Sequence, residues 1–130
     1  MDGTREKETG ALLDHLIVLA EDRQESAEFV TWLLGLPPAA PQGIFLAVPL
    51  GNGVTLLFKQ VDDGFPGQHY AFRVGAGQFA EILDRVRQAG IAFRGSPRGG
   101  QEQQTYELGG DRGFYLYDPA GHQLEVLTEA

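Results

Sequence analysis

The sequence predicts an α+β fold made of two similar modules, each a strand followed by a helix and then further strands. The first observation is an internal repeat: GIFLAVPLGNGVTLL (43–57) aligns without a gap with GFYLYDPAGHQLEVL (113–127). The second is an apolar strand upstream of each copy, opening with His15 in one and His69 in the other. Each of these strands leads into a helical pattern that ends at a glycine. A repeat of this kind largely decides the architecture.

The length of 130 residues suits a single domain. We expect residues 1–10 to form a short flexible leader and residues 11–130 to form one domain. Module one occupies 11–61 and module two occupies 68–128. The turn-rich stretch DDGFPG (62–67) is the expected link between them.

Composition excludes several classes of function. No window approaches the roughly 18 consecutive apolar residues of a membrane span, and the polar N-terminus lacks a signal core, so we expect a cytoplasmic protein with no membrane partner. The net charge is −8 and no basic run exists to meet phosphates, which argues against nucleic acid. There is no cysteine, so any metal must be bound by His, Asp, Glu or backbone groups.

The expected strands are apolar or alternating runs bounded by turn residues. In chain order they are 11–20, 43–48, 53–60, 68–74, 91–93, about 104–108, and the two arms of a final hairpin within 113–127. The stretch from 95 to 113 is rich in Gly and Gln, and it predicts a mobile loop flanking the 104–108 strand.

Two helices are expected from apolar residues at helical spacing. The first covers 26–34 and ends at Gly35, a residue that suits a C-terminal cap before two prolines. The second covers 76–88 and ends at Gly90. Its apolar stripe consists of Phe79, Ile82, Leu83 and Val86.

Three chemically active residues stand inside apolar strands: His15, His69 and Glu125. A lone histidine in a strand is more often an ordinary core or edge residue, and a carboxylate can sit on an edge strand facing solvent. In a pseudo-two-fold fold, however, equivalent positions meet near the axis, so we expect the two histidines to come together. Two imidazoles and one carboxylate form the ligand set of an open site for Fe(II), Mn(II), Zn(II) or a related divalent ion.

Three segments carry a resemblance to a known family: DHLIVLAEDRQESAEFVTWLLGL, HYAFRV and FYLYDPAGHQLEVL. Through them the chain resembles the vicinal oxygen chelate superfamily, which includes glyoxalase I, extradiol dioxygenases, fosfomycin-resistance transferases and bleomycin-binding proteins. The resemblance covers nearly everything from 12 to 127. It implies two βαβββ modules whose mixed sheets curl around a metal cavity, as in the glyoxalase-like fold, commonly completed in a homodimer. It also implies His15, His69 and Glu125 as the metal ligands.

Departures from the family's sequence patterns narrow the choice among its known activities. Thr55 stands where glyoxalase I has a fourth ligand, a glutamate. Tyr115, ten residues before Glu125, fits the tyrosine of extradiol dioxygenases, but their additional histidines are absent apart from His122. The loop at 109–113 and the short C-terminal end depart from the fosfomycin transferases.

Alternation along the strands gives further candidates, since residues two apart share a face. Tyr115 is the candidate catalytic residue. The candidates for substrate contact are Arg73, Tyr106, Tyr117, Phe45 and Thr55. Arg73 suits an anionic group, whereas the tyrosines are also typical of core aromatics, and His122 is interpreted as a turn residue.

The sequence therefore predicts a metal-dependent enzyme of the glyoxalase and dioxygenase superfamily. We expect one divalent ion per site (Fe, Mn, Zn or Ni), held by two histidines and one glutamate, which chelates a small oxygenated substrate. The reaction is left open among dioxygenase-, isomerase- and transferase-like chemistry. The alternative is a non-catalytic homodimer that binds a drug or other small molecule, as bleomycin-resistance proteins do.

Overall fold

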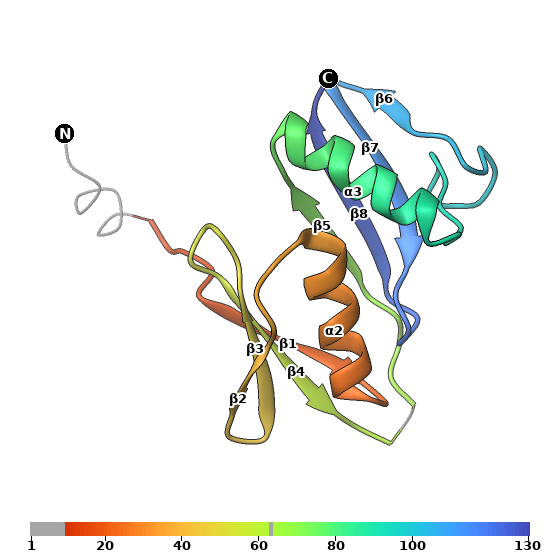
Figure 1. The fold of residues 1–130 in the computed structure, drawn as a ribbon. Helices are drawn as coiled ribbons and strands as arrows, with labels where there is room; N and C mark the ends of the chain where they lie inside the picture. The colour runs from red at the N-terminus through yellow and green to blue at the C-terminus, as the bar shows by residue number, and fades with distance from the viewer. Residues whose placement is uncertain (1–9, 63) are drawn as a thin grey trace.

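The computed structural model describes residues 10–62 and 64–130, and the chain forms two modules in succession (Figure 1). Apart from Gly10, the predicted flexible leader lies outside the described residues. Within the described ranges, no helix is long and apolar enough to cross a membrane.

Module one contains β1 (His15–Ala20), α2 (Arg23–Leu34), β2 (Ala40–Gln42), β3 (Phe45–Pro49) and β4 (Thr55–Gln60). Its strands form one sheet in the order β1-β4-β3-β2, in which β1 and β4 are parallel and the other neighbours antiparallel.

Module two repeats this plan with β5 (His69–Arg73), α3 (Ala76–Gln88), β6 (Tyr106–Leu108), β7 (Asp111–Tyr117) and β8 (Gln123–Glu129). Its sheet has the order β5-β8-β7-β6, again with one parallel pair, β5 and β8. The α+β fold of two βαβββ modules is therefore confirmed.

Three strand assignments from the sequence need correction. The first strand begins at His15 rather than at residue 11, because its partner β4 begins at Thr55, directly opposite His15. Residues 91–93 form no strand, and only the following Arg94 makes isolated bridges, to Glu102 and Tyr115. The short strand β2 was not predicted; it is exposed throughout and has no apolar alternation to reveal it.

The helices are fixed by their ends. Helix α2 starts three residues earlier than predicted because Asp22 caps it, accepting a hydrogen bond from the Glu25 N–H at 3.1 Å. It ends at Gly35, whose φ of 68° is the left-handed conformation that glycine adopts most easily. Helix α3 covers the predicted range, and its predicted apolar stripe is buried.

Each helix lies across one face of its own sheet (Figure 1). The buried residues between helices and sheets form one core that continues from module one into module two. Among its fully buried members are Leu33, Phe58, Phe79 and Phe114. The helices are also joined directly, because Arg85 Nη1 donates a hydrogen bond to the Leu33 carbonyl at 2.7 Å.

The other face of each sheet carries no helix from the described parts of the chain (Figure 1). Within the described residues of one chain, the two sheets are separate and do not close around a cavity. The uncovered face of module one presents His15 and Ile17, the latter 47% exposed. The uncovered face of module two presents His69 and Glu125.

His122 ties the two modules together. Its ring is fully buried; Nδ1 accepts from the Gln68 N–H at 2.9 Å and Nε2 donates to the Leu19 carbonyl at 2.7 Å. The turn that carries it is held by Asp118, whose Oδ1 accepts from the backbone N–H groups of Ala120 (3.0 Å) and His122 (2.8 Å). The turn after β7 is thus attached both to the end of β1 and to the link between modules.

Candidate metal centre

The candidate centre lies on the uncovered face of module two, where β5 and β8 run side by side. In the parallel register His69 faces Gln123, and Ala71 faces Glu125. Because alternate residues share a face, His69 and Glu125 are diagonal neighbours on that face. Their side chains meet: His69 Nε2 lies 3.0 Å from Glu125 Oε1.

The other ring nitrogen of His69 fixes the tautomer. Gln123 Nε2 donates to the Pro97 carbonyl at 2.9 Å, so the amide oxygen Oε1 is the atom that faces His69 Nδ1, at 3.0 Å. A carbonyl oxygen can only accept, so Nδ1 carries a hydrogen and a neutral imidazole leaves Nε2 with its lone pair toward Glu125. Two acceptor atoms that face each other at this distance require a proton or a cation between them.

This spacing fits a divalent ion. Ligand atoms that are each about 2.1 Å from a metal and 3.0 Å apart subtend an angle of about 90° at the metal, the angle between neighbouring ligands of an octahedral site. The donor set of one imidazole nitrogen and one carboxylate oxygen suits first-row divalent ions. The His69 and Glu125 side chains therefore have the chemistry and the spacing of two adjacent metal ligands.

Two tyrosines border the carboxylate. The Tyr106 hydroxyl donates a hydrogen bond to Glu125 Oε2, and burial, together with this hydrogen bond and the carboxylate charge, raises the pKa of Tyr106. The Tyr115 ring lies 5.9 Å from the His69 ring and 5.5 Å from the Tyr106 ring. Burial and then the negative charge of Glu125 raise the pKa of Tyr115 as well. Both phenols thus remain neutral hydrogen-bond donors at physiological pH.

Arg73 lies on the same face of the sheet but already has a partner. Its Nη1 and Nη2 donate to the two oxygens of Asp111 at 3.0 and 2.9 Å. These hydrogen bonds lower the pKa of Asp111 and raise the pKa of Arg73. An anionic substrate group would have to compete with Asp111 for the guanidinium.

The remaining candidates occupy other places. His15 and Thr55 face each other on module one, with His15 Nδ1 bonded to Asp14 Oδ2 at 2.8 Å, and Phe45 lies on β3 of the same sheet. Tyr117 is at the end of β7, with the Arg94 guanidinium 4.7 Å over its ring. The structure thus brings together His69, Glu125, Tyr106 and Tyr115, and leaves His15, Thr55 and Phe45 on the other sheet. Within the described ranges no three His, Asp or Glu side chains gather to bind a metal.

The two histidines do not occupy strictly equivalent positions when the strand pairing is compared with the sequence repeat. Thr55 aligns with Glu125 in the repeated sequence, yet His15 faces Thr55 whereas His69 faces Gln123. The offset is two residues, which preserves the face on which each histidine lies.

Sequence reasoning missed the residues that orient the candidate ligands. Gln123 lies two residues before Glu125 and so shares its face, but it was not among the predicted site residues, and Pro97 lies in a loop whose position no local pattern reveals. Asp111 precedes Tyr115 by four residues on β7, so alternation could have placed it on this face had the strand been predicted to begin two residues earlier.

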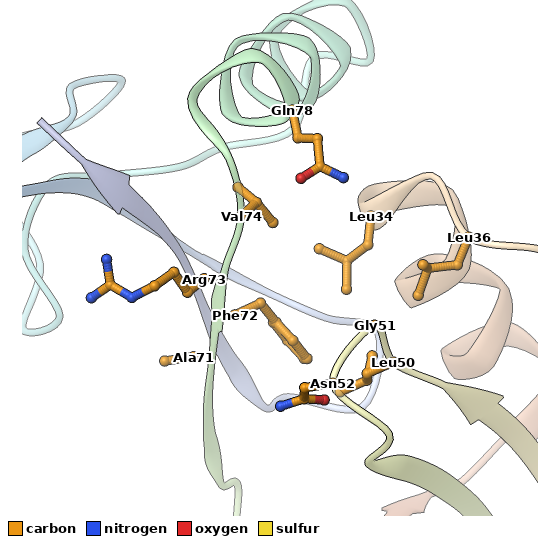
Figure 2. Close-up of a pocket in the computed structure, with 10 residues that line it drawn as sticks. All are labelled: Leu34, Leu36, Leu50, Gly51, Asn52, Ala71, Phe72, Arg73, Val74 and Gln78. Atoms are coloured by element: carbon orange, nitrogen blue, oxygen red, sulfur yellow. The ribbon is translucent and has the colours of Figure 1, made fainter. Parts of the chain in front are cut away.

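A cleft of about 610 Å³ lies between β5 and module one, and His69, Glu125, Tyr106 and Tyr115 are not among the residues that line it. Figure 2 shows Ala71 and Arg73 pointing to one side of β5 and Phe72 to the other, toward Leu34 and Leu50. Ala71 belongs both to the lining of this cleft and to the register pair with Glu125.

Comparison with known proteins agrees with this fold. Glutathione transferase FosA from Serratia marcescens is 31% identical over 120 residues, which are 88% of this chain and 78% of that protein. The structure of oxidase ChaP-H1 is 39% identical with a TM-score of 0.89, over 93% of this chain and 98% of that chain. A glyoxalase/dioxygenase from Nostoc punctiforme shares the fold, with a TM-score of 0.70 at 20% identity over 92% of each chain.

The chain belongs to the vicinal oxygen chelate superfamily. Its relatives FosA and ChaP-H1 are named as a transferase and an oxidase, so both are enzymes. No family model matches the sequence.

Proposed function

We propose that this protein is a metal-dependent enzyme in which His69 and Glu125 bind a divalent ion together with His15 from a second copy of the chain. The substrate is a small oxygenated molecule. The observation that carries the proposal is the approach of His69 Nε2 to Glu125 Oε1 at 3.0 Å, with His69 Nδ1 committed to Gln123.

The placement of His15 supports a site shared between two chains. Its side chain is 57% exposed, and Asp14 engages Nδ1, which leaves Nε2 free for a metal. It lies on one uncovered sheet face while the other two ligands lie on the other. In a two-fold dimer the module-one face of each copy meets the module-two face of its partner, and two equivalent sites result.

A divalent ion held by His69, Glu125 and a second chain's His15 would supply Lewis acidity toward the oxygens of a small substrate. Around it, the Tyr115 phenol is a neutral donor placed to hydrogen bond to a substrate oxygen, because its ring lies against that of His69.

Elemental analysis of protein purified without a tag or chelator tests the metal. We expect about one divalent ion per chain, lost in His69→Ala and in Glu125→Ala while the fold is retained. The identity of the metal then directs the assays: iron to oxygen-dependent ring cleavage or oxidation, and manganese, nickel or zinc to thiol addition and isomerisation. Absence of metal even after reconstitution would contradict the proposal and leave a non-catalytic ligand-binding dimer.

A mixing experiment tests whether two chains share the site. His15→Ala and His69→Ala chains are each expected to bind no metal. After the two are denatured together and refolded, random pairing should restore about a quarter of the wild-type metal content, because half of the dimers contain one intact site. No recovery, with the heterodimer demonstrated, would place all three ligands in one chain.

A further inference from the structure

Tyr106 occupies a position that only a glycine opposite it allows. Strands β6 and β7 pair Tyr106 with Gly113. A Cβ atom added to Gly113 would lie 2.5 Å from the Tyr106 hydroxyl oxygen, 2.6 Å from Cζ and 2.7 Å from Cε2. Real Cβ atoms do not approach other atoms so closely, so any side chain at 113 would displace the phenol ring.

In this position the phenol reaches across β7 to β8. Its hydroxyl donates to Glu125 Oε2, while Glu125 Oε1 faces His69 Nε2. The two carboxylate oxygens therefore have separate partners. The Glu125 side chain is only 14% exposed, so few water molecules compete with Tyr106 for Oε2.

We propose that Tyr106 and Gly113 together position Glu125 as a metal ligand. Gly113 leaves room for the phenol ring, and the hydroxyl holds Oε2 so that Oε1 is presented beside His69 Nε2. Tyr106 thus orients a ligand, whereas alternation along the strands had predicted that it contacts substrate. The inference rests on the proposed function, because it concerns the same metal.

The expected size of the effect follows from two physical terms. A free glutamate side chain has several rotamers, and fixing it before the metal arrives removes part of the entropy loss of binding. Hydrogen-bonding partners that orient metal ligands typically change metal affinity about 10–100-fold.

The test is a titration of the metal-free dimer with Mn(II), in which the electron paramagnetic resonance signal of the free ion monitors binding. Tyr106→Phe keeps the ring and removes the hydroxyl, and we expect Mn(II) affinity to fall about 10–100-fold with little change in the unfolding temperature. The matched control is Tyr70→Phe, which removes a hydroxyl from the opposite face of the same sheet and should leave Mn(II) affinity within about twofold of wild type.

Gly113→Ala tests the space for the ring. It should weaken Mn(II) binding as much as Tyr106→Phe does, and the double variant should be no weaker than either single variant, since both changes remove one contact. Wild-type affinity in Tyr106→Phe would overturn the inference and leave the metal site standing. Additive losses in the double variant would overturn the role of Gly113. Failure of the wild-type protein to bind Mn(II) would overturn the proposed function and this inference with it.

Discussion

At the scale of single residues, two short chains of hydrogen bonds meet at the candidate centre. One runs from the Pro97 carbonyl through Gln123 to His69, and the other links Glu125 to Tyr106. Between His69 and Glu125 two acceptors face each other, and that is where a cation fits. Each neighbour in these chains orients the next, so a residue that never touches the metal affects its binding.

Gln123 offers the clearest test of these chains. Gln123→Leu removes the acceptor for His69 Nδ1–H, so the ring loses its fixed tautomer and we expect Mn(II) affinity to fall about 10–100-fold. Gln123→Glu keeps an oxygen acceptor at the same place and should bind Mn(II) at least as tightly as wild type. Equal affinity in the Leu variant, measured by the same titration, would mean that His69 is oriented by other contacts.

Asp118 gives the protein a predictable pH dependence. Burial is the main cause that raises the pKa of its carboxyl, outweighing the backbone hydrogen bonds that lower it. The folded state therefore holds its proton to higher pH than the unfolded state does. As a result, Asp118 lowers the free energy of unfolding as pH rises from the unfolded value of about 3.9 through the raised folded pKa.

Asp118→Asn should remove this slope. The amide oxygen can still accept from the Ala120 and His122 N–H groups but carries no charge to bury. In urea unfolding at a series of pH values, we expect the variant to lose less stability than wild type as pH rises above about 4. An unchanged pH profile would show that the burial of Asp118 is not what makes stability pH-dependent.

At the scale of elements, helix α3 was the most predictable feature. Helix α3 matches its predicted range because its apolar stripe, the preceding Gly75 and the following Gly90 all mark the same element. Residues 11–14 and 91–93 show the opposite case. They are apolar enough for strands, but a strand also needs a partner, and neither segment has one alongside it over its length.

Two glycines in or beside helices should respond oppositely to alanine. Gly35 has a φ of 68°, so Gly35→Ala forces a left-handed residue and should lower the free energy of unfolding by about 1 kcal/mol. Gly77 lies exposed in the first turn of α3 with open space around it, so Gly77→Ala should raise the free energy of unfolding by roughly 0.5–1 kcal/mol. Chemical denaturation of both variants checks the pair, and a loss of stability in Gly77→Ala would contradict it.

At the scale of the whole molecule, the modules are joined by a continuous core and by His122. Sequence reasoning interpreted His122 as a turn residue, which describes its place but not its contacts. Its partners, Leu19 and Gln68, lie 103 and 54 residues away in the chain, and no local pattern reveals such pairings.

His122→Ala should therefore destabilise the protein strongly. It leaves the Gln68 N–H and the Leu19 carbonyl without the ring as partner and removes a fully buried side chain, which together should cost about 3 kcal/mol. The control is His15→Ala, measured with chelator present so that no metal contributes, which removes an exposed ring and should change stability by less than about 0.5 kcal/mol. Similar losses in both variants, compared by urea unfolding, would contradict the linking role of His122.

The candidate site could be predicted only in part, because local patterns place residues within one module but not contacts between modules or chains. His69 and Glu125 lie on adjacent strands of one module, so alternation and the hairpin suffice to place them on one face. His15 belongs to the other module, and where it ends up depends on the angle between modules and on a second copy. The sequence repeat made the two histidines look equivalent, but it contains no information about which faces meet.

The separation of His15 from the other two ligands has a consequence for how the protein behaves in dilute solution. In the proposed arrangement an isolated chain holds only part of a site, so metal content and turnover per chain should both decline when the protein is diluted below the dissociation constant of the dimer. Added metal should then shift chains back toward pairs. The amount of active enzyme in a cell would follow roughly the square of its abundance in that range, and small changes in expression would produce larger changes in catalytic capacity.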